Sequence, residues 1–253
     1  MFWIDTVKPP TAMAVLIAAM LAVPASAATL VVRSSGPSAK AYPAGRQLAD
    51  NSRISLQAGD QVVILDSRGT RTLKGPGTFS PNVATNRPSD SRETFAEVSS
   101  RRARPGATRA VPKPTEAAAE PDRSPNIWFV DVERSGTVCI ADTDAVTLWR
   151  PAGTAAAATL TNVADGSSEK IEWAAGQSRK AWPASLPVRD GASYRIAWDG
   201  MNLQGELRFA LLDPVPAGLE DMASRLITKG CEAQLDLLIE TVAMPEAAAR
   251  PKG

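Results

Sequence analysis

The sequence predicts a mainly β protein, and three observations lead to this fold class. Short apolar and β-branched runs recur every 8–12 residues or so with Gly-based turns between them, which is typical of sandwiches and barrels. A stretch rich in Pro, Arg, Ala, Ser and Thr interrupts this pattern over residues 81–126. After residue 213, the apolar residues change to helical spacing. We therefore expect a small β domain, a flexible linker, and an immunoglobulin-like or jelly-roll β-sandwich that carries a C-terminal helical hairpin.

The first β domain is expected over residues 28–80. Residues 53–57 (RISLQ) alternate apolar and polar side chains, as a half-buried strand does. Residues 61–66 (QVVILD) have a continuous apolar centre, which predicts a strand buried on both faces. Gly-containing turns precede and follow these strands.

Residues 81–126 contain few large apolar side chains and are predicted to be a flexible linker, because such a segment buries too little surface to offset its ordering entropy. Acidic residues follow the basic ones closely, which favours a solvated linker. The alternative is that a basic cluster contacts an anionic lipid or glycan surface. The cluster comprises Arg101, Arg102, Arg104, Arg109 and Lys113.

The second β domain is expected over residues 127–213, as seven or eight short strands. Residues 158–163 and 170–175 flank an Asp165-Gly166 turn, which predicts a hairpin because Asp-Gly tolerates positive φ. Several strands contain tryptophan, which indicates core packing or, alternatively, an exposed row on which sugar rings stack. The tryptophans concerned are Trp128, Trp149, Trp173, Trp182 and Trp198.

Residues 214–244 are predicted to form a helical hairpin that packs on the sandwich. Leu219, Met222 and Leu226 begin one apolar stripe, and Gly230 is expected to end that helix. A second stripe starts at Cys231. Residues 245–253 are expected to be a disordered tail.

The N-terminal residues 1–27 have the features of a secretory signal peptide. Lys8 precedes an apolar run over residues 12–23, and small residues follow, so cleavage is expected after Ala27 or Ala28. The run is shorter than the roughly 20 residues of a membrane span. The prediction is an exported, periplasmic protein with no transmembrane segment in the mature chain, and an uncleaved anchor is the alternative.

Cys139 and Cys231 are the only cysteines. An even count in an exported chain favours a structural disulfide, with two free buried thiols as the alternative. A reactive thiol normally needs a base to hold its thiolate, usually histidine, and the chain has no histidine.

The lack of histidine excludes Ser-His-Asp and Cys-His catalysis and imidazole-based zinc sites. Ser167 and Lys170 fit an S-x-x-K spacing, but they fall on a predicted hairpin instead of a helix. Asp142 and Asp144 are more typical of a turn than of a calcium site. We therefore expect no catalytic residues, no metal and no cofactor, and the formal net charge of +1 gives no support for nucleic-acid binding.

Residues 45–80 resemble the FecR-like domain of bacterial envelope proteins. Gly45 with Leu48, the Gly59-Asp60 turn, and the stretch from Leu73 to Phe79 carry the resemblance. It implies signal transmission across the periplasm, or adhesion and binding. The chain lacks the cytoplasmic N-terminal region of FecR regulators, which argues against direct anti-sigma activity.

These features together predict a non-enzymatic envelope protein that binds another envelope component, protein more than glycan, in signalling or as a scaffold. A carbohydrate-binding accessory module and a carboxylate-dependent hydrolase are the alternatives. The first requires an exposed row of tryptophans, and the second requires carboxyl groups that face each other across a cleft.

Overall fold

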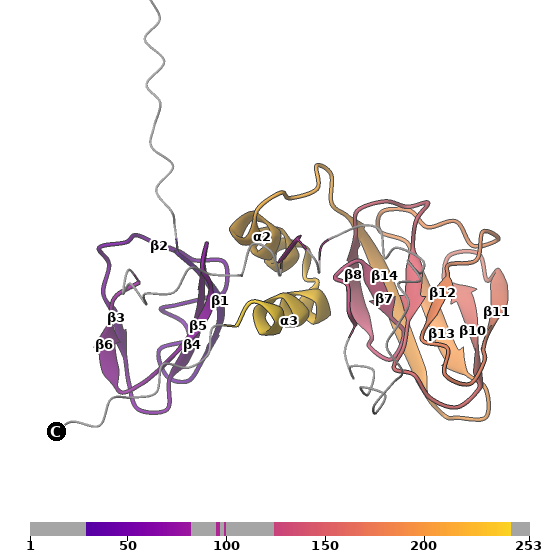
Figure 1. The fold of residues 1–253 in the computed structure, drawn as a ribbon, viewed down its shortest axis with the longest axis horizontal. Coiled ribbons are helices and arrows are strands. Elements are labelled where there is room, and N and C mark those ends of the chain that lie inside the picture. The colour runs from indigo at the N-terminus through magenta and orange to yellow at the C-terminus, as the bar shows by residue number, and fades with distance from the viewer. Residues whose placement is uncertain (1–28, 82–94, 97–98, 100–123, 244–253) are drawn as a thin grey trace, which may run out of the picture.

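The protein is described by a computed structural model that covers residues 29–81, 95–96, 99 and 124–243. The prediction of a mainly β protein is confirmed, with two helices near the C-terminal end of this part of the chain. Figure 1 shows these helices, α2 and α3, between an N-terminal β unit (residues 29–81) and a C-terminal β unit (residues 127–213). The predicted signal peptide with Ala27 and Ala28, most of the linker and the C-terminal tail lie outside the described residues.

The N-terminal β unit contains an antiparallel sheet with the strand order β2-β1-β4-β5 and a smaller pair, β3 with β6. The continuous apolar run of β4 is buried on both faces, as its sequence predicts. Val62 and Ile64 contribute to a core beneath β3 and β6, whereas Val63 and Leu65 face the helices. The strands are β1 Thr29–Ser35, β2 Gln47–Leu48, β3 Ile54–Leu56, β4 Gln61–Asp66, β5 Gly69–Lys74 and β6 Gly77–Phe79.

The C-terminal β unit contains a five-stranded sheet in the order β11-β10-β13-β14-β8 and a three-stranded sheet in the order β12-β9-β7. Neighbouring strands are antiparallel except for β14 with β8 and β7 with β9, which are parallel. The strands are β7 Phe129–Asp131, β8 Gly136–Ile140, β9 Thr147–Trp149, β10 Ala156–Asn162, β11 Ser168–Trp173, β12 Arg179–Ala181, β13 Ser193–Trp198 and β14 Gln204–Leu211.

Alternating side chains of both sheets enclose one apolar core in this unit. Leu148 of β9 and Leu160 of β10 are fully buried within it. Trp182 makes edge contacts with Tyr194 and Phe209, with ring centroids 4.9 Å and 5.1 Å apart. Such pairs add to the stability that area burial provides.

The helix pair consists of α2 Leu219–Lys229 and α3 Glu232–Thr241. The bounds of α2 match its apolar stripe. Gly230 adopts the left-handed conformation (φ 73°), and the N–H of Cys231 donates to the carbonyl of Leu226, a glycine-based helix stop. The chain therefore turns into α3 without an intervening loop.

A single apolar cluster, here called the central core, joins the helix pair to both β units. Leu30 and Leu65 enter it from the N-terminal sheet, and Ala210 and Leu212 enter it from the C-terminal β unit. The sequence predicts the helix pair on the sandwich, and the structure places it against the N-terminal sheet as well (Figure 1). Phe95 is in the range predicted as linker but is also buried in the central core.

No helix in the described part of the chain combines the length and the apolar character needed to cross a membrane.

Candidate functional site

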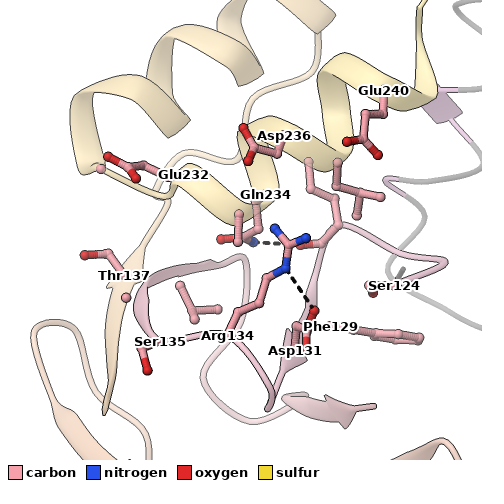
Figure 2. A pocket seen from close by; sticks show the side chains of 16 residues that line it. Ser124, Phe129, Asp131, Arg134, Ser135, Thr137, Glu232, Gln234, Asp236 and Glu240 are labelled. Carbon is pink, nitrogen blue, oxygen red and sulfur yellow. Dashed lines mark hydrogen bonds and ion pairs between the residues drawn. The ribbon is translucent and has the colours of Figure 1, made fainter. Parts of the chain in front are cut away.

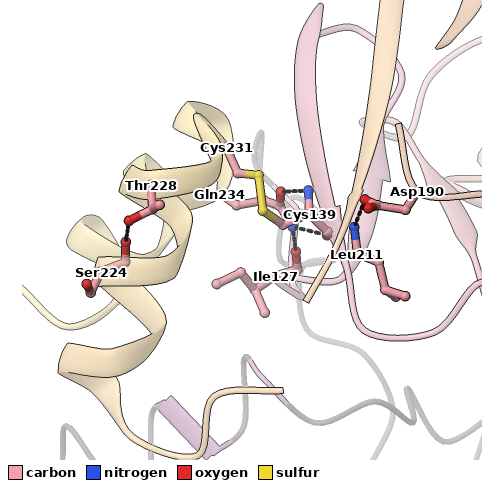
Figure 3. The surroundings of a disulfide bond; sticks show 8 residues. All are labelled: Ile127, Cys139, Asp190, Leu211, Ser224, Thr228, Cys231 and Gln234. Atoms are coloured by element: carbon pink, nitrogen blue, oxygen red, sulfur yellow. Dashed lines mark hydrogen bonds between the residues drawn. A yellow bond between two sulfur atoms is a disulfide. The ribbon is translucent and has the colours of Figure 1, made fainter. Parts of the chain in front are cut away.

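A disulfide joins Cys139 of β8 to Cys231, the residue that precedes α3, across 92 positions of sequence (Figure 3). The prediction that these two cysteines are paired is confirmed. Both are fully buried, in the central core. The bond therefore fixes the start of α3 to the edge strand of the five-stranded sheet.

The side chain of Gln234 lies beside the disulfide and binds the main chain of β8 (Figure 3). Its Oε1 accepts from the N–H of Cys139 at 2.6 Å, and its Nε2 donates to the carbonyl of Cys139 at 2.7 Å. The same Nε2 donates to the carbonyl of Ile127 at 2.6 Å. Gln234 is only 6% exposed, so these bonds satisfy an amide that would be costly to bury unpaired.

A groove of about 300 Å³ begins next to this contact, between α3 and the edge strands β7 and β8. This volume lies at the small end of the range for ligand pockets. Figure 2 shows α3 on one side of the groove and Asp131 and Arg134 on the other. The lining also includes the start of β8, from Ser135 to Val138, and the buried ring of Phe129.

The α3 wall of the groove is acidic. Glu232, Asp236 and Glu240 are four residues apart and lie along the same side of the helix (Figure 2). Arg33 of β1 forms an ion pair with Asp236. On the opposite wall, Arg134 pairs with Asp131, with its Nε 3.6 Å from a carboxylate oxygen.

Burial affects the acidity of the β7 wall. Desolvation raises the pKa of Asp131, and the opposing effects of the Glu133 N–H and the Arg134 charge are smaller. Desolvation also raises the pKa of Glu133, to which the charge of Asp131 adds. The groove therefore contains a carboxyl that holds its proton to a higher pH than an exposed aspartate does.

The sequence also predicts a basic cluster and a signal-cleavage site. Arg101, Arg102, Arg104, Arg109 and Lys113 lie outside the described residues, as do Ala27 and Ala28.

The tryptophans do not form an exposed row. Trp182 is half-buried against Tyr194 and Phe209. The other four considered from the sequence are buried, and they are Trp128, Trp149, Trp173 and Trp198. The arrangement that a sugar-stacking platform requires is therefore not present among them.

The other residues considered from the sequence, Asp142 with Asp144 and Ser167 with Lys170, form local turn and surface contacts. The carboxylate of Asp142 accepts the N–H of Asp144 at 2.9 Å, a turn contact. Ser167 donates to Asp165, whereas Lys170 pairs with Asp199 at 3.0 Å, so the S-x-x-K residues have separate partners. The described residues contain no group of three His, Cys, Asp or Glu side chains that could hold a metal ion.

Sequence reasoning missed Gln234, Arg134 and the acidic wall. A polar residue within an apolar helix stripe was the available signal for Gln234. The repeated spacing of Glu232, Asp236 and Glu240 was the available signal for the wall, because residues four apart share a helix face.

Comparison of the chain with protein-family models, curated proteins and solved structures finds no match.

Proposed function

We propose that this protein is an exported, non-enzymatic protein of the bacterial envelope that binds another envelope protein, as a scaffold or in signalling. The observation that carries the proposal is the groove between α3 and β8, which combines an acidic wall with the edge of a sheet. Exposed sheet edges are recurrent sites of peptide recognition. The signal-like residues 1–27 and the buried disulfide support an oxidising compartment outside the cytoplasm, the periplasm.

The proposal includes an immunoglobulin-like sandwich for residues 127–213. The order β10-β13-β14 in one sheet matches strands C-F-G of such a sandwich, and β9-β12 in the other sheet matches strands B-E. The parallel pairing of β7 with β9 departs from the antiparallel pairing of strands A and B. Tyr194 lies near the start of β13, and its hydroxyl donates to the carbonyl of Pro187 at 2.8 Å. This contact is similar to the tyrosine corner found at the start of strand F. The disulfide departs from the antibody pattern because it leads to a helix.

The proposal also includes a FecR-like unit for residues 29–80. The Gly59-Asp60 turn that carries the resemblance is well anchored. The Asp60 carboxylate accepts the N–H of Ser38 at 2.8 Å and the N–H of Gln57 at 2.5 Å. Because the central core joins this unit to the helix pair, a partner that binds the groove would contact a body that contains both β units.

Site-specific photo-crosslinking in intact cells tests the proposed function. A photo-crosslinking residue at Ser135, which is exposed and lines the groove, is compared with one at Glu172. Glu172 is the matched control because it is exposed on β11, the opposite edge of the same sheet. One defined envelope protein crosslinked from Ser135 but not from Glu172 is expected. The same products from both positions, or none from Ser135, would contradict the proposal.

One alternative has a specific observation in its favour. Asp131 and the acidic side chains of α3 lie on opposite walls of the groove (Figure 2), and burial raises the pKa of Asp131, as it does for a general acid. This arrangement suits a carboxylate-dependent hydrolase. Hydrolysis of peptidoglycan fragments that is lost in Asp131→Asn, and retained in Glu172→Gln, would favour the enzyme over the binding protein.

A further inference from the structure

The exposed edge of β8 has a defined hydrogen-bonding pattern. β8 pairs with β14 in a parallel register, and the N–H of Leu212 donates to the carbonyl of Ile140. In a parallel pair, alternate residues direct both main-chain groups to the same neighbour. Gly136, Val138 and Ile140 therefore face β14, whereas Thr137 and Cys139 face away from it.

The described part of the chain satisfies only one of these two outward positions. Gln234 binds both main-chain groups of Cys139, so its side-chain amide substitutes for a neighbouring strand. Thr137 comes two residues earlier on the same edge and lines the groove. Within the described ranges, no residue forms a hydrogen bond to its outward N–H or C=O.

The acidic wall faces this open position. Like charges four residues apart destabilise a helix on their own, so the spacing of Glu232, Asp236 and Glu240 is unfavourable without nearby cations. Arg33 forms an ion pair with Asp236, whereas Glu232 has no ion-pair partner in the described part of the chain. The charge of this wall therefore suits a cationic side chain.

We propose that an extended segment of a partner protein adds to β8 at Thr137 and places a lysine or arginine against Glu232. This inference rests on the proposed function and names the chemistry of the partner. An added strand lies about 4.8 Å from β8, and its side chains alternate between its two faces. Main-chain bonds to Thr137 supply affinity, and the cation selects the segment, as in other cases of strand addition.

Binding of three synthetic peptides to the full-length protein tests this inference. The first is an eight-residue peptide of alternating Val and Lys, and the second has Glu in place of Lys. The third is the Lys peptide N-methylated at alternate residues, which removes ladder donors without changing charge. Amide chemical shifts report the site, and fluorescence anisotropy reports the affinity.

The Lys peptide is expected to shift the amide resonance of Thr137. It should also bind about tenfold more tightly than the Glu peptide, because the acidic wall repels the negative charges of the Glu peptide. N-methylation is expected to weaken binding about fivefold, since each lost ladder bond has a modest net effect. Glu232→Gln should weaken both peptides that contain Lys but not the Glu peptide, and Glu172→Gln should leave all three affinities unchanged.

The variant Thr137→Pro removes the outward N–H at an edge position where proline is tolerated. It should weaken binding of the Lys peptide to the level of its N-methylated form.

Equal affinity of the N-methylated and unmodified peptides, or amide shifts that do not include Thr137, would overturn strand addition. The proposed function would still stand in that case if Ser135 crosslinks to one partner. Crosslinks from Ser135 to this chain's own basic residues 101–113 would assign the groove to an internal segment and would also overturn the inference.

Discussion

Gln234 holds the main chain of Cys139 from the side opposite β14, by accepting its N–H at 2.6 Å and donating to its carbonyl at 2.7 Å. The disulfide binds the side chain of the same cysteine to Cys231, three residues before Gln234. The start of α3 is thus attached to β8 by one covalent bond and one amide contact. This double attachment positions the acidic wall beside the open part of the strand edge.

Replacing Gln234 with leucine should destabilise the protein by at least about 2 kcal/mol, because three buried main-chain groups lose their partner. Gln234→Glu should also destabilise the protein, because a carboxylate can still accept the N–H of Cys139 but cannot donate to the carbonyls of Cys139 and Ile127. Unfolding in denaturant measures these changes. Gln204→Leu, at an exposed position on β14, is the control and should change stability by no more than about 0.5 kcal/mol. If Gln234→Leu lowers the free energy of unfolding no more than the control does, the hydrogen bonds of Gln234 do not stabilise the fold.

The two cysteines should behave as one unit in stability measurements. Cys139→Ser, Cys231→Ser and the double variant should lower the melting temperature equally, because each removes the same 92-residue crosslink. The expected cost is about 2–5 kcal/mol. Thermal unfolding of the wild type in reductant provides the matched comparison. Additive losses in the double variant would mean that the two residues stabilise the fold independently.

The central core predicts that both β units unfold in one transition. Leu226 of α2 is fully buried there, and Leu226→Ala should cost about 2–5 kcal/mol. Hydrogen exchange should show Val63 on β4 and Ala210 on β14 losing protection together. Leu203→Ala, at a side chain that is 51% exposed, is the control and should have little effect. Loss of protection at Val63 with Ala210 still protected would show that the units unfold separately.

Local sequence patterns predict much of the fold, but they do not predict how the helix pair packs against the two β units. The apolar run of β4 predicts a strand covered on both faces, and the structure agrees. The second cover comes from α2 and α3, more than 150 residues later in the chain. Periodicity shows that a helix has an apolar face, but it does not show which surface that face will cover. For that reason, the sequence predicts contact of the helix pair with the sandwich but not with the N-terminal sheet.

The candidate site could be predicted only in part. The pairing of the two cysteines follows from their even number and from the exported compartment that residues 1–27 predict. Gln234 could not be placed, because its partners are main-chain groups whose positions depend on the folded sheet. The groove likewise depends on how α3 crosses β7 and β8, which no local pattern specifies.

Gly75 should not tolerate alanine. A Cβ at this position would lie 2.0 Å from the carbonyl oxygen of Gln57, too close for any adjustment without moving the main chain. Gly75→Ala is therefore expected to cost about 1–3 kcal/mol or more. Gly153→Ala is the matched control, since its nearest neighbour would be 3.9 Å away, at the end of Arg150. Equal melting temperatures for the two variants would contradict this prediction.

Asp131 should make stability depend on pH. Burial raises the pKa of its carboxyl in the folded state, so between the ordinary aspartate value and the raised value the folded protein binds more protons than the unfolded chain. The free energy of unfolding should therefore fall as pH rises through this window. Asp131→Asn keeps an acceptor for the Glu133 N–H and should remove that part of the slope.

Unfolding free energies of the wild type and Asp131→Asn, measured from pH 3 to pH 7, test this expectation. Glu133 contributes in the same direction, because burial and the charge of Asp131 raise its pKa. The double variant with Glu133→Gln should therefore flatten the profile further. A difference between wild type and Asp131→Asn that does not change with pH would contradict the assignment.

The central core also sets the order in which a growing chain can mature. The sheet that contains β1 and β4 is synthesised early, but the helices that cover Leu30 and Leu65 come at residues 219–241. The hydroxyl of Thr70 donates to the carbonyl of Ile239, a contact that spans 169 positions of sequence. Such distant contacts slow folding and leave apolar surface open to chaperones and proteases in the meantime. A nascent chain that ends before α3 lacks part of the cover of that surface, so its N-terminal sheet stays partly exposed until the last helix is made.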